Sequence, residues 1–216
     1  MVVNILVNKH SIVNQYMSEI RDVTIQKDSM RFRRNIERVG EIMAYEISKT
    51  MEYEVEEITT SLGIATGSRL KEQPVIGSIL RAGLPLHNGV LNVFDNAANA
   101  FISAYRKSHK LGGVDIQIDY LSSPELADKV LILCDPMLAT GTSMVLTYKK
   151  LLERGTPRHT HIISVIASSE GLSYARKFLP ENVTLWLGAV DEELTAQAYI
   201  VPGLGDAGDL AYGNKM

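Results

Sequence analysis

The chain has one cysteine, no marked excess of charge of either sign and no long apolar run, and each absence excludes a class of protein. Because Cys134 is the only cysteine in 216 residues, no intramolecular disulfide can form, and a reducing compartment such as the cytoplasm is expected. With 22 Lys and Arg against 25 Asp and Glu, the chain lacks the basic excess that binds a nucleic-acid backbone. No apolar stretch is long enough to cross a membrane, and residues 1–10 lack a basic leader, so neither a membrane span nor a targeting segment is expected.

The length and the 45% of hydrophobic residues predict one domain with a sizeable core. Several short runs are apolar on both faces and alternate with helix-like segments, as buried parallel strands do. The predicted strands span residues 74–80, 100–105, 130–134, 161–167 and 183–190. We therefore predict an α/β fold with a mostly parallel sheet, flanked by helices and built from right-handed crossovers.

Three segments are predicted to lie outside this sheet. Residues 31–51 carry apolar side chains at helical spacing, and residues 58–70 combine β-branched residues with glycines, as in a small β hairpin. Residues 107–129 are polar, with only VDIQIDY suggesting a strand, so we expect a mobile loop or flap there. The expected division is an N-terminal arm of helix and hairpin (1–73), a core sheet (74–190) and a C-terminal hood (191–216). Apolar stripes on the arm predict a homodimer or a higher homo-oligomer.

The strongest local signal is VLILCDPMLATGTS, residues 130–143. A buried strand ends at Asp135, and a loop rich in glycine and hydroxyl side chains then opens a helix. Unpaired amides at a helix start bind phosphate, and an acid at the end of a central strand can accept hydrogen bonds from ribose hydroxyls. The alternative is an ordinary turn in which Ser and Thr only cap the helix. The terminal Asp favours the phosphate loop.

Three blocks carry a family resemblance. DPMLATGTS (residues 135–143) resembles the phosphoribosyl pyrophosphate loop of type I phosphoribosyltransferases, and its Asp-Pro opening is similar to that of the uracil-specific branch. ILRAGL (79–84) and YIVPGLGDAGD (199–209) resemble two further blocks of uracil phosphoribosyltransferases, in the expected order. Weaker likeness extends over LVNKHSIV, MRFRRNIERVGEIMAYE and ASSEGL. The implied reaction joins uracil to phosphoribosyl pyrophosphate, giving UMP and pyrophosphate for pyrimidine salvage.

The resemblance also implies roles for particular residues. Arg81 and Arg106 would contact the pyrophosphate, where guanidinium groups also stabilise the leaving group. Arg81 and Asp206 are the implied catalytic residues. The residues implied to hold the phosphate and ribose are Asp135, Pro136, Met137, Leu138, Ala139, Thr140, Gly141, Thr142, Ser143 and Asp206.

The glycine-rich C-terminal block is implied to bind the base. Ile200 and the backbone of Gly205, Asp206 and Ala207 would hydrogen-bond uracil, and Asp206 would orient the base or help its N1 atom lose a proton. Gly203, Gly205 and Gly208 also spell GxGxxG, but only eight residues follow, so we expect no helix and no second strand of a dinucleotide fold there. A disordered glycine-rich tail is the other alternative.

Mg²⁺ is the expected cofactor, held mainly by the substrate's phosphates without a dedicated protein site. His159 and His161 look like solvated or edge residues, and Cys134 looks like core packing. The chain has KSHK at residues 107–110 where the resembled family usually has acids, which leaves open any response to an effector nucleotide such as GTP.

Two other functions stay open at this point. A regulator of the same superfamily, either non-catalytic or bifunctional, would sense nucleotides and bind RNA or another protein, although the missing basic excess speaks against RNA. A phosphoribosyltransferase for another base would keep the reaction and change the pocket.

Overall fold

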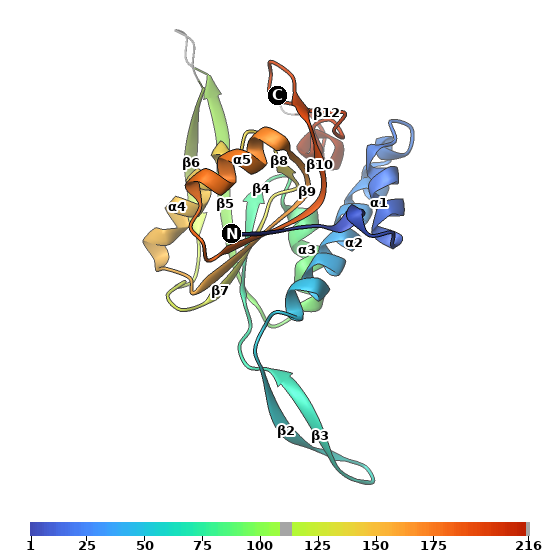
Figure 1. Cartoon of the computed structure of the whole chain (residues 1–216), viewed down its shortest axis with the longest axis vertical. Coiled ribbons are helices and arrows are strands. Elements are labelled where there is room, and N and C mark those ends of the chain that lie inside the picture. The colour runs from blue at the N-terminus through green and yellow to red at the C-terminus, as the bar shows by residue number, and fades with distance from the viewer. Residues whose placement is uncertain (109–113, 215–216) are drawn as a thin grey trace.

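The computed structural model describes the backbone of residues 1–108 and 114–214, and the side chains of these residues outside 104–117 (Figure 1). The strands are β1 (Val2–Ile5), β2 (Tyr53–Thr60), β3 (Gly63–Leu70), β4 (Val75–Leu80), β5 (Ala98–Ser108), β6 (Val114–Ser122), β7 (Val130–Cys134), β8 (Met137–Leu138), β9 (His159–Ser168), β10 (Val183–Asp191), β11 (Glu193–Leu194) and β12 (Ile200–Val201). The helices are α1 (Ile12–Arg21), α2 (Ser29–Ser48), α3 (Leu84–Val93), α4 (Thr142–Leu151), α5 (Ser169–Phe178) and α6 (Ala207–Tyr212), with short 3₁₀ turns at Leu6–Asn8, Ile25–Lys27 and Leu152–Arg154.

The central sheet is mostly parallel, as the sequence predicts. Its strands lie in the order β1-β10-β9-β7-β4-β5-β6, and β8 adds a short parallel pairing to β9. All five predicted strands are present, with β5 longer than expected at both ends. The α/β fold class is therefore confirmed, whereas the division into arm, core and hood stays a prediction.

Both edges of the sheet differ from the sequence interpretation. β1 pairs in parallel with β10, so Val2–Ile5 add an edge strand that the sequence did not predict. Its four residues are too few for a periodic signal. At the other edge, β6 contains the VDIQIDY stretch that suggests a strand, and it pairs antiparallel with β5, so Val114–Ser122 belong to the sheet and not to a loop. Residues 109–113, at the tip of this segment, lie outside the described residues.

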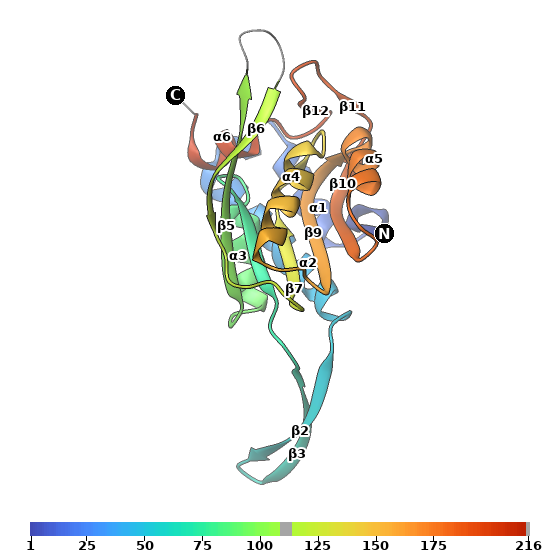
Figure 2. The same cartoon turned by 90° about the vertical axis from the view of Figure 1, so that its left-hand side faces the viewer.

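Helices cover both faces of the sheet and enclose two apolar clusters. The first cluster joins α1, α2 and α3 to one face, and the second joins α4 and α5 to the other. The two views in Figures 1 and 2 show these layers on opposite sides of the strands. No helix in the described ranges is long and apolar enough to cross a membrane.

The helix predicted at residues 31–51 is α2, and its start is fixed by a side-chain cap. The carboxylate of Asp28 accepts hydrogen bonds from the amides of Met30 (3.0 Å) and Arg31 (3.1 Å). Such caps satisfy amides that have no partner within the helix. The preceding helix, α1, was not predicted. It begins at a capping box in which Ser11 and Asn14 bond reciprocally to each other's backbone amides.

The predicted hairpin is confirmed and is longer than expected. β2 and β3 pair from Tyr53 and Leu70 at the base to Thr60 and Gly63 at the tip. Both views show it extending away from the sheet, at the end opposite α6 (Figures 1 and 2). It carries exposed apolar side chains, with Leu62 at the tip 98% exposed.

The interpretation of His161 as a solvated residue is wrong. His161 is only 4% exposed, and its Nδ1 accepts a hydrogen bond of 3.1 Å from the indole nitrogen of Trp186 on β10. The ring of His159 lies 4.6 Å away, since alternate residues of β9 face the same side. Burial, with the neighbouring His159 adding a smaller effect, lowers the pKa of His161 to about 3. The imidazole is therefore neutral at physiological pH.

This neutral histidine makes the stability of the protein depend on pH. In the unfolded chain a histidine has a pKa of about 6.5, so below that pH the unfolded state binds a proton that the folded state excludes. The contribution is complete above pH 6.5 and is lost as the pH falls toward 3. In urea titrations followed by the fluorescence of Trp186, the unfolding free energy of His161→Gln should fall by roughly 2 kcal/mol less than that of the parent between pH 6.5 and 4.5. Equal slopes for the two proteins would contradict a neutral His161.

Candidate active site

The site lies where the direction of the chain reverses along the sheet. β4 and β7 are parallel neighbours, but the chain continues from β4 to β5 on one side and from β7 to β9 on the other. The two connections leave the carboxyl ends of the strands in opposite directions, and a crevice opens between them. Arg81 directly follows β4, and Asp135 directly follows β7.

A cleft of about 500 Å³ occupies this crevice. Four segments line it: residues 79–82 at the end of β4 and just beyond it, residues 135–144 apart from Pro136 and Thr142, residues 197–199, and residues 206–208. The loop before α4 and the glycine-rich C-terminal segment, which lie more than 60 residues apart in the sequence, therefore face one shared space.

The loop after β7 is attached to β9 along its first half. The amide of Asp135 donates to the carbonyl of Ile163 (3.2 Å), and the amide of Ile166 donates to the carbonyl of Pro136 (3.0 Å). β8 then pairs with β9 at Ile166 and Ala167. One carboxylate oxygen of Asp135 accepts from the amide of Met137 at 3.3 Å, which orients this side chain at the end of the strand.

The second half of the loop rests on the start of α5. The hydroxyl of Ser168 donates to the carbonyl of Ala139 (2.5 Å) and accepts from the amide of Gly171 (2.8 Å). Gly171 lies so close that an added Cβ would meet the Ala139 carbonyl oxygen at 2.2 Å. Only glycine permits two backbones to approach this closely. The close approach lets the carbonyl of Ala139 point toward α5.

α4 begins at the cleft with a left-handed residue. Gly141 precedes the helix with φ 76°, and an added Cβ would lie 2.8 Å from the carbonyl oxygen of Gly171. The hydroxyl of Thr140 donates to that of Thr142 at 3.3 Å. Ten helical residues follow, and their first amides, at the positive end of the helix dipole, can donate to an anion.

Arg81 reaches across the cleft to the C-terminal segment. Its Nη2 lies 3.1 Å from a carboxylate oxygen of Asp209 and 3.2 Å from the carbonyl oxygen of Gly213. Its Nε is buried and has no hydrogen-bond partner among the described residues. The side chain is 39% exposed, so part of the guanidinium remains accessible from the cleft.

The glycine-rich segment is ordered, so a disordered tail through Asn214 is excluded. The carboxylate of Asp206 accepts from the amide of Asp209 (3.0 Å) and caps α6. The expectation that no helix follows the GxGxxG pattern is wrong, because α6 spans Ala207–Tyr212. These six residues are too few for the crossover that a dinucleotide fold requires, and Ala207 and Gly208 face the cleft instead.

The structure places most, but not all, of the implied site residues on the cleft. The lining includes Arg81, Asp135, Met137, Leu138, Ala139, Thr140, Gly141, Ser143, Asp206 and Ala207. Pro136, Thr142, Ile200 and Gly205 are outside the lining, although each lies within two residues of it in the sequence. Arg106 lies on β5, and its side chain is outside the described residues.

The sequence interpretation missed several lining residues, chiefly Gln197, Ala198 and Tyr199 between β11 and β12. The amide of Tyr199 donates to the hydroxyl of Thr195, and Ala198 has a φ of 63°. Only Tyr199 had a signal, as the first residue of the YIVPGLGDAGD block. Leu80, Ala82, Met144 and Gly208 are each next to an implied residue or lie within an implied block.

The single thiol is not part of the site. Cys134 is fully buried, and burial, with a smaller effect from the charge of Asp135, raises the pKa of its thiol well above the usual value. The thiol is therefore protonated and unreactive, and its packing role is confirmed. Within residues 1–103 and 118–214, whose side chains are described, no three His, Cys, Asp or Glu side chains gather in a way that could hold a metal ion.

Comparisons with known proteins agree with the site. The family model for uracil phosphoribosyltransferase matches residues 7–214. A uracil phosphoribosyltransferase of Porphyromonas gingivalis is 56% identical over 208 residues, covering 96% of each chain, and one of Methanothermobacter thermautotrophicus is 39% identical over 94% of this chain and 92% of its own. The solved structure of the AQ2163 protein from Aquifex aeolicus superposes with a TM-score of 0.86 and 31% identity, covering 99% of this chain and 98% of that one. The chain belongs to the uracil phosphoribosyltransferase family.

Proposed function

We propose that the protein transfers the phosphoribosyl group of phosphoribosyl pyrophosphate to uracil, giving UMP and pyrophosphate in pyrimidine salvage. The observation that carries the proposal is the single cleft shared by the loop before α4 and the residues at the start of α6. A sugar phosphate held on one side meets a base held on the other. The buried thiol fits a reducing compartment, and we place the enzyme in the cytoplasm.

The phosphate side of the cleft suits a ribose 5′-phosphate. Amides at the start of α4 and the hydroxyls of Thr140 and Ser143 supply donors, and Thr142 adds its amide from just outside the lining. Asp135 has carboxylate oxygens at the end of β7 to accept from ribose hydroxyls. Pro136, Met137, Leu138 and Ala139 shape the wall. Arg81 and Arg106 would bind the pyrophosphate through their guanidinium groups.

The base side of the cleft is built from backbone. Uracil would lie between Tyr199 and the segment from Gly205 to Ala207, with main-chain groups reading its polar edges. Ile200 is buried, so its side chain anchors this strand, and its backbone, opposite Leu194 of β11, is the part that would hydrogen-bond uracil.

The reaction forms the bond from uracil N1 to C1′ of the ribose and breaks the bond from C1′ to pyrophosphate. The bonding electrons leave with pyrophosphate, whose added charge Arg81 would stabilise. The proton leaves N1. The carboxylate of Asp206 faces the cleft, where it would either accept this proton or orient the base.

Removing either charged group should lower turnover of uracil and phosphoribosyl pyrophosphate to UMP. Asp206→Asn keeps an oxygen to cap α6, so we expect an intact fold with kcat reduced about 100-fold or more. Arg81→Ala should have a similar effect because the leaving group loses a cation. Arg34→Ala is the control, since this arginine on α2 is similarly exposed (44%) and also paired to an acid. Full activity in both site variants would refute the assignment. If another base is converted in place of uracil when the two compete, that base is the substrate.

The donor set is compatible with Mg²⁺ bound chiefly through the substrate. Asp135 and Asp206 present carboxylate oxygens to the cleft, the ligand type that this ion prefers, alongside the space for phosphates. When bound, Mg²⁺ neutralises part of the charge on pyrophosphate. The protein would then need no complete site of its own.

Chelation should therefore abolish UMP formation without unfolding the protein. We expect EDTA to remove activity, added Mg²⁺ to restore it, and the melting temperature without substrate to change by less than about 1 °C, because the metal binds with the phosphates. Activity that persists in excess EDTA would contradict the proposed cofactor.

We also propose that the protein forms a homodimer or a higher homo-oligomer through the β2–β3 hairpin. Val55, Leu62 and Ile64 are 74%, 98% and 71% exposed, which is unusual for apolar side chains of an isolated chain. Light scattering at micromolar concentration should give at least twice the chain mass of 23.9 kDa. A monomer would contradict the proposal.

Adding GTP to the activity assay shows whether a purine nucleotide acts as an effector.

A further inference from the structure

The base-binding segment is held from behind by an ion pair that does not reach the cleft. Gly203 lies in the turn after β12, with φ 63°, and an added Cβ would meet the carbonyl oxygen of Ile200 at 2.0 Å. Its amide donates to a carboxylate oxygen of Asp191 (2.8 Å), and its carbonyl accepts from Nη1 of Arg21 (3.2 Å). Both polar backbone groups of this glycine are therefore bound by one pair of side chains.

Arg21 and Asp191 bind each other in a bidentate arrangement. Nη1 of Arg21 lies 2.7 Å from one carboxylate oxygen of Asp191, and Nη2 lies 2.9 Å from the other. Arg21 ends α1 and Asp191 ends β10. Two parallel hydrogen bonds fix both distance and orientation, which a single contact would not. The turn at Gly203 is thus attached to a helix and a sheet strand at once.

The pair is sheltered enough to matter energetically. The side chain of Asp191 is 8% exposed and that of Arg21 is 25% exposed. Burial alone would raise the pKa of Asp191, but hydrogen bonds from Arg21 and from the amide of Gly203 outweigh it and hold the pKa below the usual value. The carboxylate is therefore charged near neutral pH, and removing one partner would leave a poorly solvated charge.

Neither member of the pair lines the cleft, and neither does Gly203. Only two residues separate Gly203 from Asp206, and Leu204 between them is buried in the core. Any rotation of the turn at Gly203 would therefore move the amides of Gly205 and Ala207. Resting on the function proposed above, we propose that Arg21 and Asp191 are positioning residues that set the geometry of uracil binding through Gly203.

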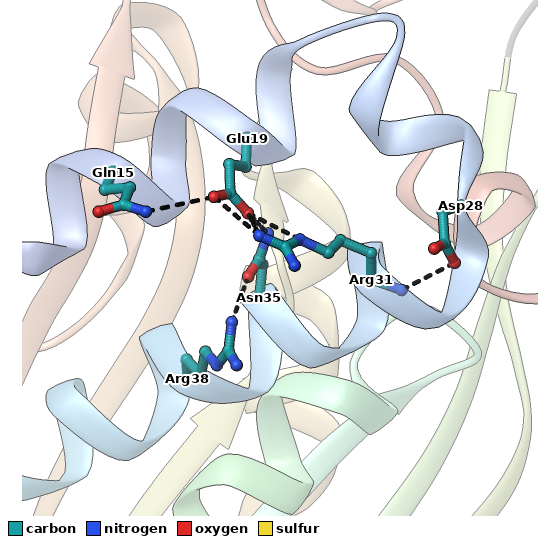
Figure 3. A network of polar contacts seen from close by, with 6 residues as sticks. All are labelled: Gln15, Glu19, Asp28, Arg31, Asn35 and Arg38. Carbon is teal, nitrogen blue, oxygen red and sulfur yellow. Dashed lines mark hydrogen bonds and ion pairs between the residues drawn. The ribbon is translucent and has the colours of Figure 1, made fainter.

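A second ion pair on α1 provides a matched control. Figure 3 shows Glu19, which accepts two hydrogen bonds of 3.0 Å from Arg31 and one of 2.8 Å from Asn35. Glu19 is 13% exposed and lies two residues from Arg21, but Arg31 and Asn35 are on α2, and its remaining partner is Gln15 of α1 (3.4 Å). It therefore matches Asp191 in burial and in its bidentate arginine, without a recorded contact to the glycine-rich segment.

The experiment compares Asp191→Asn and Arg21→Lys with Glu19→Gln in steady-state UMP formation. We expect the KM for uracil to rise about tenfold or more in the first two. The KM for phosphoribosyl pyrophosphate should rise much less, because the loop before α4 is attached to α5 and only Arg81 connects the pyrophosphate side to the C-terminal segment. Glu19→Gln should leave both KM values within about twofold. The double variant of Arg21 and Asp191 should be little worse than either single variant, since the two residues act as a unit.

Hydrogen exchange without substrate separates this proposal from the proposed function. In Asp191→Asn the amide of Gly203 loses a charged acceptor, so exchange over residues 203–209 should accelerate about tenfold or more, and in Glu19→Gln it should not. Unchanged exchange in Asp191→Asn, or equal rises of both KM values, would overturn the positioning role. A parent protein that forms no UMP would refute the proposed reaction, while the exchange result would still decide whether the pair holds the segment.

Discussion

The cleft depends on one constraint, the opposite directions in which the chain leaves two neighbouring parallel strands. β4 and β7 end side by side, and their connections turn away from each other across the sheet. Among the described residues, no other pair of neighbouring parallel strands has connections that leave in opposite directions. The topology alone therefore brings Arg81 and Asp135, which follow these strands, to the same space.

Much of the fold could be predicted because buried strands and amphipathic helices leave a local record. β7 is apolar at every position, and α2 repeats apolar residues over twenty positions. β1 has four residues, too few for periodicity to separate it from a loop. α1 does repeat apolar residues at helical spacing, at Val13, Met17 and Ile20, so its local signal was present and was missed. Which side chains of a strand are buried is equally hard to predict from sequence. His161 is buried beside Trp186, which lies on a strand more than twenty residues later.

The candidate site divides in the same way. The loop from Asp135 to Ser143 is a continuous motif, so its place at a strand end followed from sequence. The residues that support the site could not be predicted, because they are distant in the sequence from the residues they hold. Gly171 approaches Ala139 from a different helix, and Arg21 donates to Gly203, which follows 182 residues later. Tyr199 and its neighbours line the cleft through backbone conformation, which side-chain patterns do not encode. The sequence thus identified residues that line the cleft better than the residues that support them.

The two halves of the cleft are supported by different parts of the fold. α5 and β9 hold the loop before α4 through the close approach of Gly171, the hydroxyl of Ser168 and the amide of Ile166, while α1 and β10 hold the C-terminal segment through Arg21 and Asp191. β11 and β12 have two residues each, so pairing between them is too short to fix the segment alone. Because the supports share no residue, a change behind one half alters that half first. In this arrangement the loop before α4 and the C-terminal segment can shift separately, except where Arg81 pairs with Asp209.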